Sequence, residues 1–158
     1  MANRDGDGWV QCRCGGKHWG LNGAAGLLLI RGGKIMMQHR APWVHNGGTW
    51  GLPGGARDSH ESVEEAAIRE CVEETGINPE HVEVIELFTD DHRDWRYDTV
   101  IAIAHGNLET AIWNKETHDI GWFEIGEIEK LDLHPSFAKS WPTLQSVVFR
   151  IIQSSQDS

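Results

Sequence analysis

The sequence lacks any uninterrupted apolar stretch near the roughly 20 residues that a membrane-spanning helix needs. Its longest short apolar run, residues 24–30, has the length of a buried strand. The first residues, 1–8, are polar and charged, so they do not resemble a secretion signal. These absences argue against a membrane partner, and the predicted location is the cytoplasm.

Cysteine is also scarce, with Cys12, Cys14 and Cys71 as its three occurrences. An odd number, with two residues only one apart, argues against a disulfide framework and favours reduced thiols. The spacing Cys12-x-Cys14-x3-His18 suggests zinc, but it is a poor match to known sites and offers neither a fourth ligand nor a second cysteine pair. We therefore favour reduced surface thiols over a structural zinc site.

Basic residues are few: 14 Lys and Arg stand against 24 Asp and Glu, which gives a formal net charge of −10. Such a surface repels polyanions, so long nucleic acid is not an expected partner. A phosphate-bearing substrate would also be repelled, unless clustered carboxylates hold divalent cations that reverse the local field.

No internal repeat, low-complexity tract or linker interrupts the sequence, which predicts one domain over residues 1–158. Within it we expect an N-terminal loop or edge segment at 1–23, a core at 24–153 and a tail at 154–158. Strands mixed with a few helices predict an α/β (α+β) sandwich. The expected strands are 24–31, 34–40, 50–52, 81–89, 95–104 and 120–125, and the expected helices are 62–75, 126–130 and about 140–153.

The helix in the middle of the chain has the clearest boundaries. Ser62 and Glu65 have the spacing of a capping box, in which each side chain binds the other residue's backbone N–H. Gly76 provides a C-cap, and Pro79 stops any continuation.

Three glutamates of this helix, Glu70, Glu73 and Glu74, fall on one side and extend its apolar stripe. Ile68 and Val72 form a second apolar patch, so we expect the helix to be covered on both faces. Like charges at these spacings repel unless something neutralises them, and a hard divalent cation would do so. A solvated acidic face with i, i+4 salt bridges is the alternative.

The segment from 55 to 77 resembles the signature of the Nudix hydrolase family: Gly55-x5-Glu61-x7-Arg69-Glu70-Cys71-x-Glu73-Glu74-x-Gly76-Ile77. Every charged and glycine position matches. Cys71 is the one departure, in an aliphatic position where a buried thiol behaves as a small hydrophobe. Residues 50–55 also resemble the family's lead-in to the signature.

This resemblance implies an α/β/α sandwich with a mixed sheet and a metal-dependent hydrolase of nucleoside diphosphates linked to another moiety. It implies Glu70 and Glu74 as principal metal ligands and Glu73 as a further ligand or a water-bridged partner. The carbonyl of Gly55 would contribute to the metal site, and Arg69 would orient a glutamate. The expected cofactor is Mg²⁺, with Mn²⁺ as a substitute.

Cleaving a phosphoanhydride with water requires neutralised phosphate charge and an activated nucleophile. Glu70 is the first candidate for the general base. Some members use a later loop, which here is 114–119, where Glu116 is the obvious carboxylate and His118 a weaker choice. A solvated loop glutamate is the alternative interpretation of Glu116.

Three residues outside the signature are candidates for substrate binding. Arg40 closes a strand and suits a phosphate, although a surface ion pair is equally compatible. Trp43 could stack on a base, although packing is the commoner role for the eight tryptophans. Phe137 lies where the chain enters the last helix. The absence of Asn between residues 115 and 158 disfavours selection of an oxidised guanine base, which family members make with an Asn near this point.

A nucleoside triphosphate is the first predicted substrate, with the protein a monomer or homodimer. Dinucleoside polyphosphates and nucleotide sugars such as ADP-ribose are the next possibilities. A non-catalytic nucleotide sensor is a different class of function, and the intact cluster of Glu70, Glu73 and Glu74 argues against it. A metal-stabilised scaffold is permitted by the same residues but required by none of them.

Overall fold

The structure, a computed structural model, describes residues 5–106 and 117–156. In this part of the chain the strands form a seven-stranded mixed sheet and a separate two-stranded sheet. In chain order the elements are β1 (Trp9–Gln11), β2 (Lys17–Trp19), β3 (Ala24–Arg31), β4 (Lys34–Arg40), β5 (Trp50–Gly51), β6 (Gly54–Ala56), α1 (Val63–Thr75), the 3-10 helix η1 (Pro79–His81), β7 (Val82–Asp91), β8 (Arg96–Ala104), β9 (Thr117–Glu124), α2 (Ile125–Ile128) and α3 (Pro135–Gln156).

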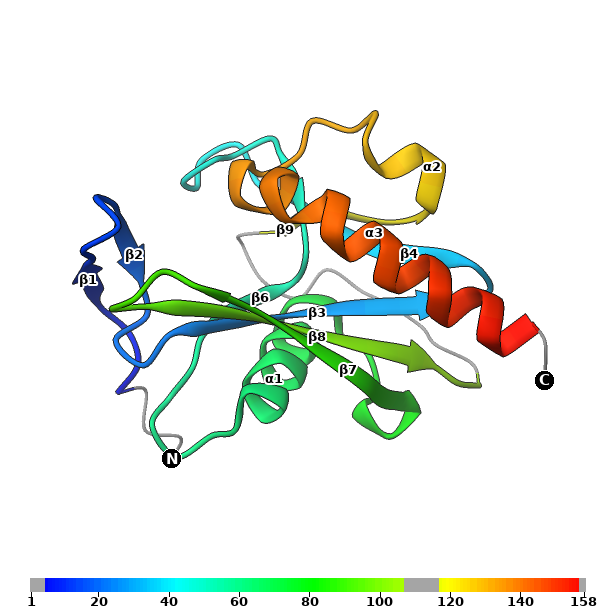
Figure 1. The fold of residues 1–158 in the computed structure, drawn as a ribbon, viewed down its shortest axis with the longest axis horizontal. Helices are drawn as coiled ribbons and strands as arrows, with labels where there is room; N and C mark the ends of the chain where they lie inside the picture. The colour runs from blue at the N-terminus through cyan, green and yellow to red at the C-terminus, as the bar shows by residue number, and fades with distance from the viewer. Residues whose placement is uncertain (1–4, 107–116, 157–158) are drawn as a thin grey trace.

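The large sheet has the order β5-β4-β3-β8-β7, with β6 paired to β3 and β9 paired to β4. The pair β3–β8 is parallel, and the other pairs of this sheet are antiparallel. Helix α1 covers one face and α3 the other, as Figure 1 shows. The predicted α+β sandwich with a mixed sheet is confirmed.

Strand β3 is buried on both faces because its side chains alternate between two cores. Leu27 and Leu29 belong to the core under α1, whereas Leu28 and Ile30 belong to the core under α3. Each fully buried side chain of this size contributes about 1.5–3 kcal/mol to stability. This continuous apolar run therefore fixes β3 at the centre of the sandwich.

Helix α1 begins and ends where the sequence predicts. Ser62 Oγ accepts from Glu65 N (3.1 Å), and Glu65 Oε1 accepts from Ser62 N (2.9 Å). Gly76 ends the helix with a φ of 71°. Ile68 and Val72 are half-buried and pack against the same core as Ala66 and Ala67. The apolar patch of Ile68 and Val72 is therefore part of one buried side of the helix and is not covered by a separate layer.

Helix α3 begins at Pro135, earlier than the predicted start near residue 140. Proline suits the first turn of a helix because its missing N–H has no partner there. His134 Nδ1 accepts from Ser136 N (3.2 Å), which adds a cap, and Pro142 lies inside the helix. The predicted start near residue 140 is therefore wrong, since the helix has an additional first turn that contains Phe137.

The N-terminal segment, expected as a loop or edge strand, forms an antiparallel hairpin of β1 and β2 apart from the main sheet. It lies beside the turn between β7 and β8 (Figure 1). Arg13 Nε and Asp94 Oδ1 are 2.9 Å apart, and Trp95 Nε1 donates to the carbonyl of Trp19 (3.2 Å). Among the described residues, no helix is both long enough and apolar enough to cross a membrane.

Candidate active site

Two glutamates of α1 lie against the backbone of β6. A Cβ added to Gly55 would lie 2.6 Å from Glu70 Cδ, so this carboxylate occupies the space of the missing side chain. Gly54 N donates to Glu74 Oε2 (3.2 Å). Glu70 and Glu74 are buried, whereas the side chain of Glu73 is 38% exposed. The helix and the glycines of β6 together position two of the three predicted acidic ligands.

Arg69 connects the acidic side chains. Its Nε and Nη2 donate to the two oxygens of Glu61 at 2.6 and 2.9 Å, a bidentate pair. Its Nη1 reaches Glu70 Oε1 (3.1 Å) and Glu73 Oε1 (3.3 Å), and Nη2 also donates to Ala56 O (3.1 Å). Hydrogen bonding to Glu61 raises the pKa of Arg69, so the guanidinium is permanently charged. The contact with Glu73 joins residues four apart, which are neighbours on the surface of a helix.

Glu61 received no role from the sequence, although it occupies a fixed position of the signature. It is buried, and its Oε1 also accepts from Asp58 N (3.0 Å). The hydrogen bonds from Arg69 hold the pKa of Glu61 below its ordinary value. Asp58 Oδ2 is buried 3.8 Å from Arg69 Nη2 and has no hydrogen-bond partner among the described residues. Glu61 and Asp58 together anchor the guanidinium.

Tyr97 of β8 is a second residue that sequence reasoning missed. Its hydroxyl lies so close to Gly26 that any Cβ there would overlap it. Burial raises the pKa of Tyr97, the charges of Glu74 and Glu70 raise it further, and Arg40 opposes them. The charges of Glu70, Glu74 and Arg40, the last of which is predicted to bind phosphate, therefore all affect the Tyr97 hydroxyl. No motif marks Tyr97, because strand pairing brings it there.

The other predicted residues lie in different surroundings. Arg40 ends β4 and donates from Nε to His45 O (3.1 Å). Trp43 is 72% exposed in the following loop. Phe137 is buried in the core under α3, with its ring 5.6 Å from that of Trp141. Glu116 lies outside the described residues, and the roles of all four in binding or catalysis stay predictions.

The donor chemistry of the α1 cluster fits a hard divalent cation. Carboxylate and carbonyl oxygens are the ligands that Mg²⁺ prefers. One guanidinium, that of Arg69, contacts three carboxylates, those of Glu61, Glu70 and Glu73. Its single positive charge cannot balance them, so a further cation would be favoured. The carboxylate oxygens of Glu70, Glu73 and Glu74 would have to move closer together to bind one ion. Among the described residues, the groups with three ligand atoms within 4.8 Å of one another are Asp58–His60–Glu61 and Cys12–Cys14–His18.

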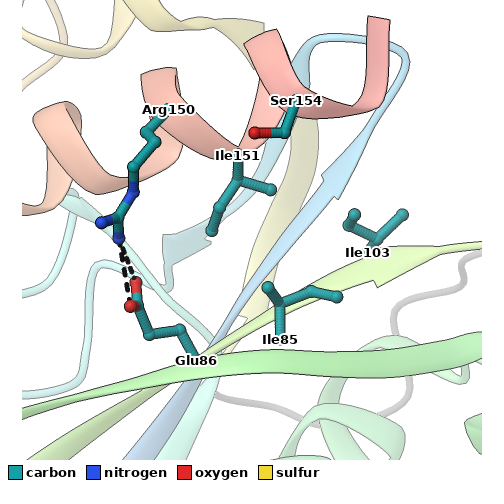
Figure 2. Close-up of a pocket in the computed structure, with 6 residues that line it drawn as sticks. All are labelled: Ile85, Glu86, Ile103, Arg150, Ile151 and Ser154. Carbon is teal, nitrogen blue, oxygen red and sulfur yellow. Dashed lines mark hydrogen bonds and ion pairs between the residues drawn. The ribbon is translucent and has the colours of Figure 1, made fainter. Parts of the chain in front are cut away.

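A pocket of about 420 Å³ lies on the other side of the sheet, between α3 and the β7–β8 edge. Figure 2 shows its apolar lining and the ion pair between Arg150 and Glu86, 2.9 Å apart. Its described lining residues include none of the predicted site residues. This pocket is therefore separate from the glutamates of α1.

Comparison with known proteins identifies the family of this chain. The model of the NUDIX domain family matches residues 20–144. A Mycobacterium tuberculosis protein named "Putative 8-oxo-dGTP diphosphatase 3" is 46% identical over 153 residues, covering 90% of this chain and 70% of that protein. The 8-oxo-dGTP diphosphatase of Escherichia coli is 27% identical over 113 residues, covering 72% of this chain and 87% of its own.

A solved structure agrees with these relatives. The crystal structure of RenU, a Nudix hydrolase from M. smegmatis, matches this fold with a TM-score of 0.83 and 43% identity, covering 92% of this chain and 97% of RenU. The chain therefore belongs to the NUDIX family and is an enzyme that hydrolyses the pyrophosphate linkage of nucleotides.

Proposed function

We propose that this enzyme hydrolyses a nucleoside triphosphate to the monophosphate and pyrophosphate with Mg²⁺, and that Mn²⁺ can substitute. The observation that carries the proposal is the placement of Glu70 and Glu74, both buried against the glycine backbone of β6. The names of two relatives favour 8-oxo-dGTP as the first substrate to test.

Glu70, Glu73 and Glu74, with the carbonyl of Gly55, would hold the divalent cation. When bound, such a cation neutralises phosphate charge and makes a water more acidic. Glu70 accepts a proton from the attacking water. The oxygen of this water bonds to phosphorus, and the bridging P–O bond breaks. Glu116 is the alternative base.

Arg69 and Glu61 act as positioning residues. Their bidentate pair fixes the guanidinium, which in turn holds one oxygen each of Glu70 and Glu73. Holding these groups in place before the substrate arrives lowers the reorganisation needed during reaction. Arg40 would meet the substrate phosphates, because a guanidinium suits bidentate contact with phosphate.

Recognition of the base would come from the loop between β4 and β5 and the start of α3. The sequence has no Asn between residues 115 and 158, which disfavoured an oxidised guanine. However, Asn46 of that loop reaches α3, with Nδ2 3.2 Å from His134 Nε2. An amide can donate to and accept from a base edge, so Asn46 is our candidate for reading it.

The test is a hydrolysis panel with Mg²⁺ on 8-oxo-dGTP, dGTP, ATP, diadenosine tetraphosphate and ADP-ribose. We expect pyrophosphate release with the highest kcat/KM for 8-oxo-dGTP. In ¹⁸O-labelled water the label reports the site of attack, because it enters the monophosphate when water attacks the α-phosphorus and the pyrophosphate when water attacks the β-phosphorus. A higher kcat/KM for ADP-ribose or the dinucleotide would refute the substrate class, and tight binding without turnover would favour the sensor.

Asn46→Ala has its own readout. If Asn46 reads the base, the ratio of kcat/KM for 8-oxo-dGTP to that for dGTP should fall by about 10-fold, the equivalent of one lost hydrogen bond. An unchanged ratio would remove Asn46 from base recognition. Trp43→Ala tests stacking in the same assay through its effect on KM.

A further inference from the structure

The β1–β2 hairpin brings together three side chains whose sequence spacing argued against a shared site. The ligand atoms of Cys12, Cys14 and His18 all lie within 4.8 Å of one another, and Cys14 Sγ is 3.1 Å from His18 Nε2. Pairing of Gln11 with Lys17 closes the turn, and Cys12 N donates to Gly16 O (2.9 Å). The hairpin therefore supplies the proximity that the spacing alone did not indicate.

Neighbouring residues hold two side chains of this cluster, those of Cys12 and His18, in place. Cys12 is only 4% exposed, and its Sγ is 2.7 Å from the carbonyl oxygen of His92 in the β7–β8 turn. The ring of His18 stacks on Trp95 at a centroid distance of 4.3 Å. Cys14 is exposed, so an ion from solvent has access to the two thiols and the imidazole.

From this geometry we infer that Cys12, Cys14 and His18 bind a Zn²⁺ ion. Two thiolates and a neutral imidazole are the donors that zinc prefers, whereas Mg²⁺ prefers oxygen. Zn–S bonds of about 2.3 Å place tetrahedral sulfur ligands about 3.8 Å apart, which is within the present spacing. Binding releases one proton from each thiol, and the two thiolates balance the charge of the ion.

His92 lies beside these three residues, with the centroid of its ring 4.7 Å from that of His18. Its Nε2 pairs with Asp90 Oδ2 at 2.9 Å. Among the described residues of this cluster, the ligand atoms within 4.8 Å of one another are those of Cys12, Cys14 and His18 alone, so solvent would supply the fourth ligand.

The ion would hold the hairpin in the conformation that contacts the rest of the protein. The three ligands come from the hairpin, and one of them, Cys12 Sγ, is 2.7 Å from the carbonyl oxygen of His92 in the β7–β8 turn. The backbone flanking the hairpin also reaches the loop before α1, where Gly6 N donates to Asp58 Oδ1 (3.0 Å). Because Asp58 and Glu61 anchor Arg69, zinc would stabilise the support of the active site without touching substrate.

The experiment is metal binding to the full chain at saturating Mg²⁺, which occupies the glutamate site. Elemental analysis should find one zinc per chain. Replacement by Co²⁺ should give one equivalent of tetrahedral cobalt with a thiolate-to-metal charge-transfer band, a signal that carboxylates cannot produce.

Cys12→Ser and Cys14→Ser should each abolish this band and the rise in Tm that zinc produces. Cys71→Ala is the matched control, because this thiol is buried in the core under α1, and it should keep both signals.

Full zinc binding by Cys14→Ser would overturn the inference, as would a wild-type chain that binds none. A Cys12–Cys14 disulfide in the isolated protein, detected by mass spectrometry, would also contradict it. Each of these results leaves the proposed hydrolysis unaffected, because that reaction depends on the glutamates of α1.

Discussion

The carboxylate of Glu70 rests on the Cα of Gly55, in the place where any other residue would carry its side chain. A Cβ at Gly55 would lie 2.6 to 2.9 Å from the Glu70 carboxylate carbon and oxygens. The position of this proposed metal ligand and base is therefore set by backbone atoms of β6. The atoms that such a Cβ would meet are the end of the Glu70 side chain, so a larger residue at position 55 would displace the carboxylate rather than the strand.

Gly55→Ala should therefore impair catalysis more than folding. Displacing Glu70 by about 1 Å is expected to lower kcat about 100-fold. Steady-state kinetics and thermal unfolding would separate the two effects. Gly126→Ala is the matched control, because a Cβ at Gly126 meets no atom within 4 Å, and it should retain wild-type kcat. Equal activity of the two variants would contradict the proposed contact.

Glu70→Gln and Glu74→Gln should each reduce kcat by at least about 100-fold, because each removes a charge from the proposed metal site. The fold should survive, since glutamine has nearly the same shape. The measurements are kcat and the Mg²⁺ concentration for half-maximal activity, with Glu64→Gln of the same helix as the comparison. Normal activity in both site variants would overturn the metal assignment.

Arg69→Ala should lower the rate less than Glu70→Gln but should destabilise the fold more. The substitution leaves the buried Glu61 carboxylate without its ion-pair partner. Breaking such a pair lowers the free energy of unfolding by about 3–5 kcal/mol. Urea unfolding measures this loss. Arg69→Lys keeps the charge but loses the bidentate contact, so we expect an intermediate stability. A rate below that of Glu70→Gln would contradict the supporting role.

Stability should fall at mildly acidic pH because of His134. Burial, together with the charges of Arg40 and His45, lowers the pKa of His134 from 6.5 to about 4. Between these values the unfolded chain binds a proton that the folded chain refuses, so acid favours unfolding. The free energy of unfolding should therefore decline as pH falls from 6.5 towards 4 and change little above 6.5 through this group.

The check is the pH dependence of urea unfolding for the wild type and for His134→Asn. Asparagine can cap α3 in place of histidine but does not titrate. The variant should show a shallower decline over this range. Identical slopes would show that other groups cause the acid sensitivity.

Local signals explain what the sequence predicted well. Strands β3 and β4 and helix α1 follow from apolar runs, glycine turns and a capping box, which act over a few neighbouring residues. The contact of Arg69 with Glu73 follows from helical spacing in the same way.

Features that depend on distant pairing were not predicted. The Tyr97 hydroxyl lies against Gly26 because β8 pairs in parallel with β3, and no local pattern specifies that register. The cysteine cluster needs the hairpin pairing of β1 with β2 and the β7–β8 turn beside it. The early start of α3 depends on the packing of Phe137 in the core under that helix.

The alternation along β3 separates the protein into two compartments that share one wall. Leu28 and Ile30 belong to one layer and Leu27 and Leu29 to the other, and the backbone of β3 lies between them. Under the proposed function, substitutions in α3 and the neighbouring loop would therefore alter the preferred base while the proposed metal ligands of α1 keep their surroundings.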